Sequence, residues 1–321
     1  MRVSNMQKWA IKGSHLGSLF IRVSFISRSV SRSLISLSLT IASITGANYV
    51  HAQDATDFQE VKQVTYQPQQ DNLVYLQSDQ GLVVIELAPF IAPNHVAQFK
   101  ALVNEGFYNG LDFYRVIDGF VAQGGDVTEK KQSKYSASLA AEFTRALTST
   151  SNFVTVQSPE FLAQETGFIQ GFPSGRSLTD KQEWLLHCPG AVAMARNNEA
   201  NSGSTDFYIV IGQAPRHLDR NMSVFGQVIY GMENVQAMKR GNPNVDGGVI
   251  NDVDQRSKIL SAKLGTSVEK NEQINFSRNL VTSDAFQARL QSARTLDSEF
   301  FHYKGTGNID VCYYRPRFTI E

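Results

Sequence analysis

The chain has 321 residues, 42% of them hydrophobic, and its formal net charge is zero because 30 basic residues balance 30 acidic ones. This length is enough for one large domain with appendages. Residues 1–52 hold six Lys and Arg and no Asp or Glu, which leaves 24 basic and 30 acidic residues, a charge of −6, in the remainder. Because an acidic protein without a basic stripe is a poor nucleic-acid binder, no nucleic-acid partner is expected.

Residues 1–52 have the pattern of a cleaved signal peptide. A basic stretch leads into the apolar residues 34–45, and Val50-His51-Ala52 forms a small-residue cleavage pattern before Gln53. The apolar run is too short and too rich in serine for a good spanning helix, so we expect a periplasmic or secreted protein with no membrane span after processing. An uncleaved anchor, a mitochondrial-type presequence and a translation start at Met6 or later are open alternatives.

The first predicted elements are a leader, a hairpin and a helix. Residues 53–71 are polar and Gln-rich without periodicity, which predicts a flexible leader. Two β-rich runs, 73–77 and 82–87, flank a turn and predict a hairpin. Pro93 suits the first turn of a following helix, in which apolar residues recur at three- and four-residue steps until Gly106 ends it.

Residues 113–126 read FYRVIDGFVAQGGD and are the most informative segment of the chain. Arg115 and Gln123 stand in an otherwise apolar strand, and a buried guanidinium is costly unless it is paired or acts on a ligand. If the strand runs unbroken, the even separation of eight residues places both side chains on one face, together with Phe113 and Val121. The simpler alternative is a sheet with one solvent-exposed face.

About sixty residues, 127–186, form a long insertion after this segment. We expect a helix near residues 138–147 and a loop in the Gly-, Pro- and Ser-rich stretch 167–177. A loop of this length in a compact domain is usually functional or mobile.

The later elements are expected to complete and decorate a barrel. Further strands are predicted at 190–196, 207–211, 224–229 and 256–264, with a short helix at 232–239. The last strand would close the barrel, because closure leaves no unpaired edge. Residues 266–321, with a helix at 283–295 and a hairpin of 300–303 and 309–314 turning at 305–308, are too few for an independent domain and are expected to pack on the barrel.

Three further blocks follow the first motif: residues 190–196 read GAVAMAR, 202–209 read SGSTDFYI and 217–226 read HLDRNMSVFG. In this order, over about residues 73–264, the four blocks resemble the cyclophilins, prolyl isomerases built on a small closed β-barrel, and look closest to bacterial secreted members. The resemblance implies a mainly β fold. Residues 72–265 would form a closed antiparallel eight-stranded barrel with two capping helices, carrying the long insertion and a small C-terminal α+β appendage.

The resemblance also implies an activity: cis-trans isomerisation of X-Pro bonds in unfolded or folding exported proteins, by a monomer. Twisting an amide needs no nucleophile, so no metal or cofactor is expected. By resemblance, Arg115 stabilises the twisted amide, Gln123 holds the substrate carbonyl or the guanidinium, and Phe120 completes the catalytic set. The implied substrate-binding residues are Val121, Ala195, Asp206, Phe207, Tyr208, Leu218, Met222 and His217. Val121 and Phe207 have packing in the barrel core as their alternative.

Several of these residues depart from the better-known eukaryotic pattern. Asp206 replaces a Gln, Met222 a His, His217 a Trp and Val121 a Met, and Arg196 is placed where it could pair with Asp206. We expect activity to survive and peptide preference to change. The competing hypothesis is a non-catalytic peptide-binding or chaperone module on the same fold.

Cys188 and Cys312 are the chain's two cysteines. In an oxidising compartment they are expected to form a disulfide that closes a loop of about 125 residues and staples the appendage to the barrel. The alternative is two buried, unpaired thiols. A metal site or thiol nucleophile built from His187, Cys188 and His217 is not supported, because no ligand spacing repeats.

Overall fold

The computed structural model describes residues 65–213 and 215–321. The predicted signal peptide and the first part of the predicted leader lie outside these residues. Within the described ranges no helix has the length and apolar character needed to cross a membrane.

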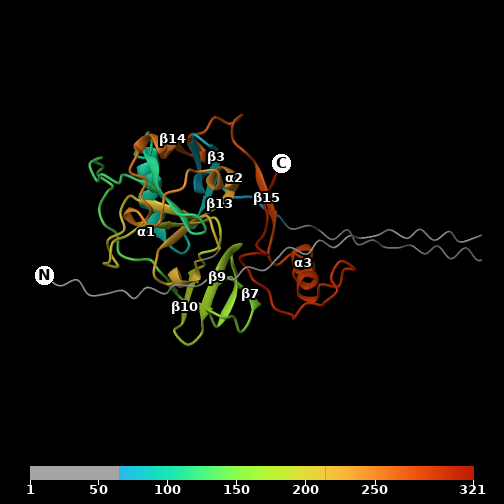
Figure 1. Ribbon diagram of the computed structural model, residues 1–321. Helices are drawn as coiled ribbons and strands as arrows, with labels where there is room; N and C mark the ends of the chain where they lie inside the picture. Colours follow the sequence, from blue (N-terminus) through green and yellow to red (C-terminus); the bar gives the residue numbers. More distant parts are fainter. Residues whose placement is uncertain (1–64, 214) are drawn as a thin grey trace, which may run out of the picture. The chain divides into compact units, whose positions relative to one another are not determined.

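Eight antiparallel strands close into a barrel, as predicted (Figure 1). Their order around the barrel is β11-β12-β5-β4-β14-β2-β3-β13. The strands are β2 Leu73–Ser78, β3 Gly81–Leu87, β4 Asp112–Val116, β5 Val121–Gly125, β11 Ala191–Met194, β12 Phe207–Val210, β13 Val224–Tyr230 and β14 Ser257–Leu264. Residues 73–78 and 81–87 form the predicted hairpin. Because the barrel is closed, its strands present no free edge.

Two α-helices pack against the barrel, as expected: α1 Pro93–Asn104 and α2 Met232–Gln236. The apolar stripe of α1 delivers Phe99 into an aromatic cluster, where its ring lies 5.4 Å from Phe207 and 4.9 Å from Phe225. Five short 3-10 helices complete this part: η1 Gln70–Asn72, η2 Arg216–Leu218, η3 Asp246–Gly248, η4 Val253–Gln255 and η5 Gly265–Ser267.

The insertion forms a second sheet, in the order β6-β10-β9-β8-β7. Its strands are β6 Arg145–Ala146, β7 Phe153–Gln157, β8 Glu165–Ile169, β9 Phe172–Ser177 and β10 Gln182–Leu185. The predicted loop at 167–177 is therefore wrong. Its glycines serve close packing: a Cβ on Gly167 would meet the Val154 carbonyl oxygen at 2.0 Å, and one on Gly175 would meet the Trp184 ring at 2.6 Å.

The helix predicted at 138–147 is also wrong, because tertiary contacts override its propensity. The Glu142 carboxylate accepts hydrogen bonds from the backbone N–H groups of Asn94 (3.1 Å) and His95 (3.0 Å) and pairs with the His95 ring. This segment therefore caps the first turn of α1. Burial opposes the ionisation of Glu142, but the hydrogen bonds from these groups outweigh it and hold the pKa of Glu142 below its usual value.

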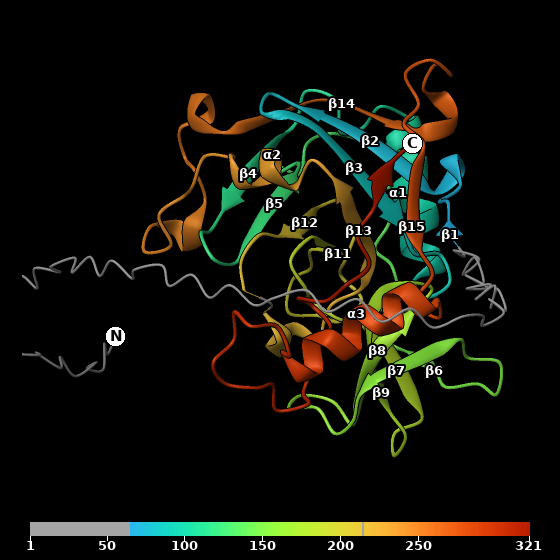
Figure 2. The same ribbon diagram turned by 90° about the vertical axis from the view of Figure 1, so that its right-hand side faces the viewer.

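The C-terminal appendage, which was expected to pack on the barrel, divides its contacts between two neighbours. Its helix α3 Asp284–Thr295, predicted correctly, packs on the insertion sheet, where Phe286 meets Phe168 edge-on at 5.6 Å (Figure 2). Strand β15 Phe276–Asn279 instead joins a barrel-side cluster through Phe276. The hairpin predicted at 300–303 and 309–314 is wrong, because those residues form turns and irregular segments.

Part of the predicted flexible leader is ordered. Strand β1 Thr65–Tyr66 pairs with β15, which pairs in turn with β16 Thr319–Ile320. The Tyr66 hydroxyl donates to Glu86 at 2.8 Å, and its ring covers the Arg278 guanidinium at 4.2 Å. This cation–π contact and hydrogen bond were not visible in the polar sequence of the leader.

The predicted disulfide between Cys188 and Cys312 is present, with the two residues 124 positions apart. It joins the segment just before β11 to the C-terminal loop, inside the apolar cluster shared by α3 and the insertion sheet. The bond therefore connects barrel, insertion and appendage.

We predict that Cys312→Ser lowers the free energy of unfolding, because a loop of this length corresponds to a chain-entropy contribution of ~5 kcal/mol. Urea denaturation of the variant and of Cys188→Ser measures the loss, and the double variant should lose no more than either single one. Two free thiols per chain on denatured, unreduced wild-type protein would contradict the bond.

Candidate functional site

The first motif folds as a hairpin, not as the unbroken strand expected from sequence. Strand β4 ends at Val116 and β5 begins at Val121, and the turn between them is closed by a hydrogen bond from the Phe120 N–H to the Ile117 carbonyl (3.0 Å). Gly119 supplies the positive φ of +69° that this turn needs. Arg115 and Gln123 still lie on one face, because they are direct cross-strand partners.

A bulge in β4 decides which side chains share that face. The register shifts between Asp112 and Arg115, so two residues, Phe113 and Tyr114, oppose one on β5. Phe113 turns into the barrel, fully buried and 5.8 Å from the Phe207 ring, so its expected place beside Arg115 is wrong. Tyr114 turns to the Arg115 side, which the alternation of a regular strand does not predict.

Arg115 is half-buried and is held by neutral acceptors. Its Nε donates to the Gly247 carbonyl of η3 at 2.7 Å, and its Nη1 donates to Gln123 Oε1 at 3.2 Å. Among the residues that the structure describes, no carboxylate forms an ion pair with it. The cation is therefore oriented but not neutralised.

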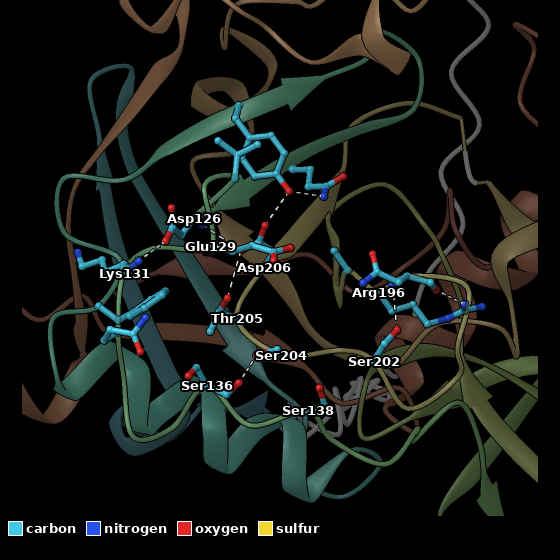
Figure 3. Close-up of a pocket in the computed structure, with 17 residues that line it drawn as sticks. Asp126, Glu129, Lys131, Ser136, Ser138, Arg196, Ser202, Ser204, Thr205 and Asp206 are labelled. Atoms are coloured by element: carbon cyan, nitrogen blue, oxygen red, sulfur yellow. Dashed lines mark hydrogen bonds between the residues drawn. The ribbon is translucent and has the colours of Figure 1, made fainter.

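The polar contacts continue from Gln123 to a carboxylate. Gln123 Nε2 donates to the Tyr114 hydroxyl at 2.5 Å, and that hydroxyl donates to Asp206 Oδ2 at 2.7 Å. Asp206 Oδ1 accepts from the Asp126 N–H at 2.9 Å (Figure 3). Burial raises the pKa of Asp206 and, together with the nearby Asp206 charge, raises the pKa of Tyr114.

The possible pairing of Arg196 with Asp206 does not occur. Arg196 donates from Nε (3.0 Å) and Nη2 (2.9 Å) to the Asn221 carbonyl. It thereby fixes the segment that carries Met222, the next residue in the chain. Asp206 accepts from the Tyr114 hydroxyl, and its role as a substrate contact stays a prediction.

The apolar candidates divide into accessible and buried residues. Phe120 is half-buried and stacks on the exposed His217 ring, with centroids 6.2 Å apart and planes 12° apart. Ala195, Leu218 and Met222 are also partly accessible. Three candidates are buried in the barrel core: Val121, Phe207 and Tyr208, with 2%, 0% and 4% of their surface exposed. For Val121 and Phe207 the structure shows the core packing that was their alternative.

Sequence reasoning missed the buried network behind Tyr208. The His187 ring bonds the Tyr208 hydroxyl at 2.9 Å through Nε2 and Asp219 at 3.0 Å through Nδ1. Arg216 donates to the other oxygen of Asp219. His187 thus connects β12 to the end of η2. Its neighbour Cys188 is in the disulfide, so this residue is not a free thiol nucleophile. In the described part of the chain no group of three His, Cys, Asp or Glu could hold a metal ion.

A cavity of about 480 Å³ lies beside Gln123 (Figure 3). Barrel residues Tyr114, Gln123 and Asp206 line one side, and insertion residues including Lys131 and Ser136 line another. The first part of the insertion therefore shapes a polar space next to Arg115's hydrogen-bond partner. Phe120, Leu218, Met222 and His217 are not part of its lining.

Gly125 makes the position of Asp206 possible. Its φ is +141°, and a Cβ there would lie 2.1 Å from Asp206 Oδ1 and 2.9 Å from Asp206 Cα.

We predict that Gly125→Ala destabilises the fold by about 3 kcal/mol, because it combines backbone strain with a clash. Gly119→Ala is the matched control: its φ is also positive but nothing lies within 4 Å, so about 1 kcal/mol is expected. Urea denaturation measures the free energy of unfolding of both variants. An equal loss in Gly125→Ala and Gly119→Ala would show that Asp206 moves aside without cost.

Comparison with known proteins identifies the family. Residues 73–264 match the model of the cyclophilin type peptidyl-prolyl cis-trans isomerase family. A probable peptidyl-prolyl cis-trans isomerase of Brucella suis is 35% identical over 194 residues, which are 60% of this chain and 83% of that protein. Peptidyl-prolyl cis-trans isomerase B of Bacillus subtilis is 30% identical over 168 residues, covering 52% of this chain and 90% of that protein.

A solved structure extends the similarity beyond the barrel. Cyclophilin AquaCyp293 from Hirschia baltica superposes with a TM-score of 0.65 at 27% identity, covering 80% of this chain and 93% of that one. The family match, these relatives and the closed barrel with its Arg115–Gln123 hairpin agree, and the chain belongs to the cyclophilin-type peptidyl-prolyl cis-trans isomerases.

Proposed function

We propose that the chain isomerises X-Pro bonds in exported proteins as they fold, with Arg115 stabilising the twisted amide. The observation that carries this mechanism is the half-buried guanidinium held by the Gly247 carbonyl and the Gln123 amide without a paired carboxylate. A cation that is oriented, unneutralised and partly accessible is available to a substrate.

The chemistry requires little more than this. Rotation about an amide costs ~18–20 kcal/mol because resonance stiffens the C–N bond. When the bond twists, the proline nitrogen becomes pyramidal and gains a lone pair, which a guanidinium N–H can meet. This hydrogen bond forms only in the twisted state, so it stabilises the transition state and leaves the ground state unchanged. The barrier to rotation therefore falls. Each ~1.4 kcal/mol gained in this way corresponds to a tenfold increase in rate.

The proline ring would rest against accessible apolar groups near Arg115. Phe120, at the end of the β4–β5 turn, and His217, stacked on it, supply one surface, and Leu218 and Met222 are partly accessible nearby in the chain. The substrate would be an exposed X-Pro segment of an unfolded or folding polypeptide. A non-catalytic peptide-binding module would keep this surface but would not need Arg115 oriented and unpaired.

We predict that Arg115→Ala remains folded and loses about 100-fold or more in kcat/KM on a short X-Pro peptide, because the lost hydrogen bond belongs to the transition state. Arg115→Lys should recover only part of the rate, since it keeps the charge and loses the planar fork. Arg176→Ala is the control, because Arg176 is paired with Glu165 on the insertion sheet and should leave the rate unchanged. A folded Arg115→Ala protein as active as wild type would favour the peptide-binding alternative.

We further propose that the protein is exported to the periplasm or secreted. The basic, acid-free residues 1–52 and the Cys188–Cys312 disulfide support this location, because paired thiols persist in oxidising compartments. The mass of the intact protein from the cell-envelope fraction should correspond to a chain beginning near Gln53. A mass that includes residues 1–52 would instead indicate an anchored form.

A further inference from the structure

A series of hydrogen bonds connects Asp206 to Arg115 through Tyr114 and Gln123, and each group in it is limited in whether it can donate or accept. At one end, an ionised carboxylate can only accept; at the other, a guanidinium can only donate. Between them stand the Tyr114 hydroxyl, with one proton, and the Gln123 amide, with a donating and an accepting end. The contacts measure 2.7 Å (Tyr114 to Asp206), 2.5 Å (Gln123 to Tyr114) and 3.2 Å (Arg115 to Gln123).

These constraints give the chain one direction when Asp206 is ionised. The single Tyr114 proton must go to the carboxylate, so the Tyr114 oxygen must accept from Gln123. Only the NH₂ end of Gln123 can donate, and its carbonyl end is then turned to Arg115. The orientation of the Gln123 amide, which cannot be told from its shape alone, thus follows from the charge on Asp206.

We propose that ionised Asp206 is a positioning residue, which acts through Tyr114 to hold Gln123 in the one orientation that accepts from Arg115, and so makes isomerisation depend on its protonation. The proposal rests on the proposed role of Arg115. It replaces the substrate contact expected of Asp206 from sequence.

Protonation of Asp206 would reverse the direction. Oδ1 already accepts from the Asp126 N–H and Thr205, so the added proton belongs on Oδ2, where it points at Tyr114. Tyr114 would then donate to Gln123, and the amide would turn its NH₂ group towards Arg115. Two donors would face each other, and the guanidinium would lose its second anchor.

The surroundings favour such a titration. Burial raises the pKa of Asp206 above its usual 3.8, and the nearby negative charge of Asp126 adds to the shift. Tyr114 and Tyr108 also face it, both neutral because burial raises the pKa of each hydroxyl. The cavity that Asp206 lines also holds the charged side chains of Glu129, Lys131 and Arg196. Within residues 65–213 and 215–321, no Lys, Arg or His forms an ion pair with Asp206. Activity should therefore fall as the pH drops through this pKa.

Asp206→Asn imposes the reversed direction at every pH. The carbonyl oxygen of the introduced amide can keep the bond from the Asp126 N–H, which leaves the NH₂ group of that amide to donate to Tyr114. We expect kcat/KM on a short X-Pro peptide to fall on the order of tenfold at neutral pH, the scale of one lost charge-assisted hydrogen bond. As the pH falls from neutrality towards the ordinary Asp pKa of 3.8, the wild type should show an acid limb that the variant lacks, because the pKa of Asp206 is raised above that value.

Tyr108→Phe is the matched control. Tyr108 is buried, as Tyr114 is, and its hydroxyl donates to the Thr205 carbonyl at 2.8 Å. Thr205 is next to Asp206 in the chain, but this bond is not part of the series of hydrogen bonds from Asp206 to Arg115. Both the rate and the acid limb should be those of wild type. A loss equal to that of Asp206→Asn would mean that the whole region is merely sensitive to packing.

A double-mutant cycle tests transmission through the tyrosine. Tyr114→Phe cuts the chain, so it should also lose the acid limb, and adding Asp206→Asn to it should cost nothing further. If Asp206→Asn does not fold, Tyr114→Phe alone carries the test. An unchanged rate and acid limb in a folded Asp206→Asn or Tyr114→Phe protein would overturn the inference. A wild type no faster than Arg115→Ala would overturn the proposed function instead.

Discussion

The proposed mechanism depends on a cation, Arg115, that is oriented by its neighbours without being neutralised. A half-buried guanidinium would ordinarily be satisfied by a carboxylate, and such a pair would cancel much of the field that a twisted amide needs. Here a backbone carbonyl, Gly247, and a side-chain amide, Gln123, supply the acceptors. The nearest carboxylate in this chain of contacts, Asp206, stands two groups away, so its influence on Arg115 passes through Tyr114 and Gln123.

The insertion and the C-terminal appendage are also connected to the segment that carries His217 and Leu218. His187 ties Tyr208 of β12 to Asp219, and Asp219 and Glu160 of the insertion share the Arg216 guanidinium of η2. Cys188, the residue after His187, forms the disulfide with Cys312 of the C-terminal segment. The insertion, the appendage and the disulfide therefore brace the element that carries His217 and Leu218. If this surface binds an X-Pro segment as proposed, the bracing favours binding, because an ordered surface loses less entropy on binding.

Sequence was a good guide wherever local periodicity or pairing decides the structure, and a poor one where tertiary contacts do. Six of the eight barrel strands, α1, α3 and the disulfide were predicted, whereas β4 and β5 were expected as one unbroken strand. The insertion was not: glycines such as Gly167 and Gly175 indicate a loop locally, yet in the fold they let strands and Trp184 approach closely. Residues 138–147 have helix-forming composition, but Glu142 is used to cap α1. Such assignments depend on partners that are distant in the sequence.

The same distinction explains the site. The even spacing of Arg115 and Gln123 led to the right conclusion through the wrong geometry, since a turn and not an unbroken strand brings them together. The β4 bulge is what no alternating pattern reveals, and it is the feature that turns Tyr114 to the side of Arg115. Without it Tyr114 would lie on the opposite face, and Asp206, on the segment before β12, would have no link to Gln123. One extra residue in a strand thus connects the Asp206 carboxylate, through Tyr114, to the Gln123 and Arg115 side chains on which the proposed mechanism rests.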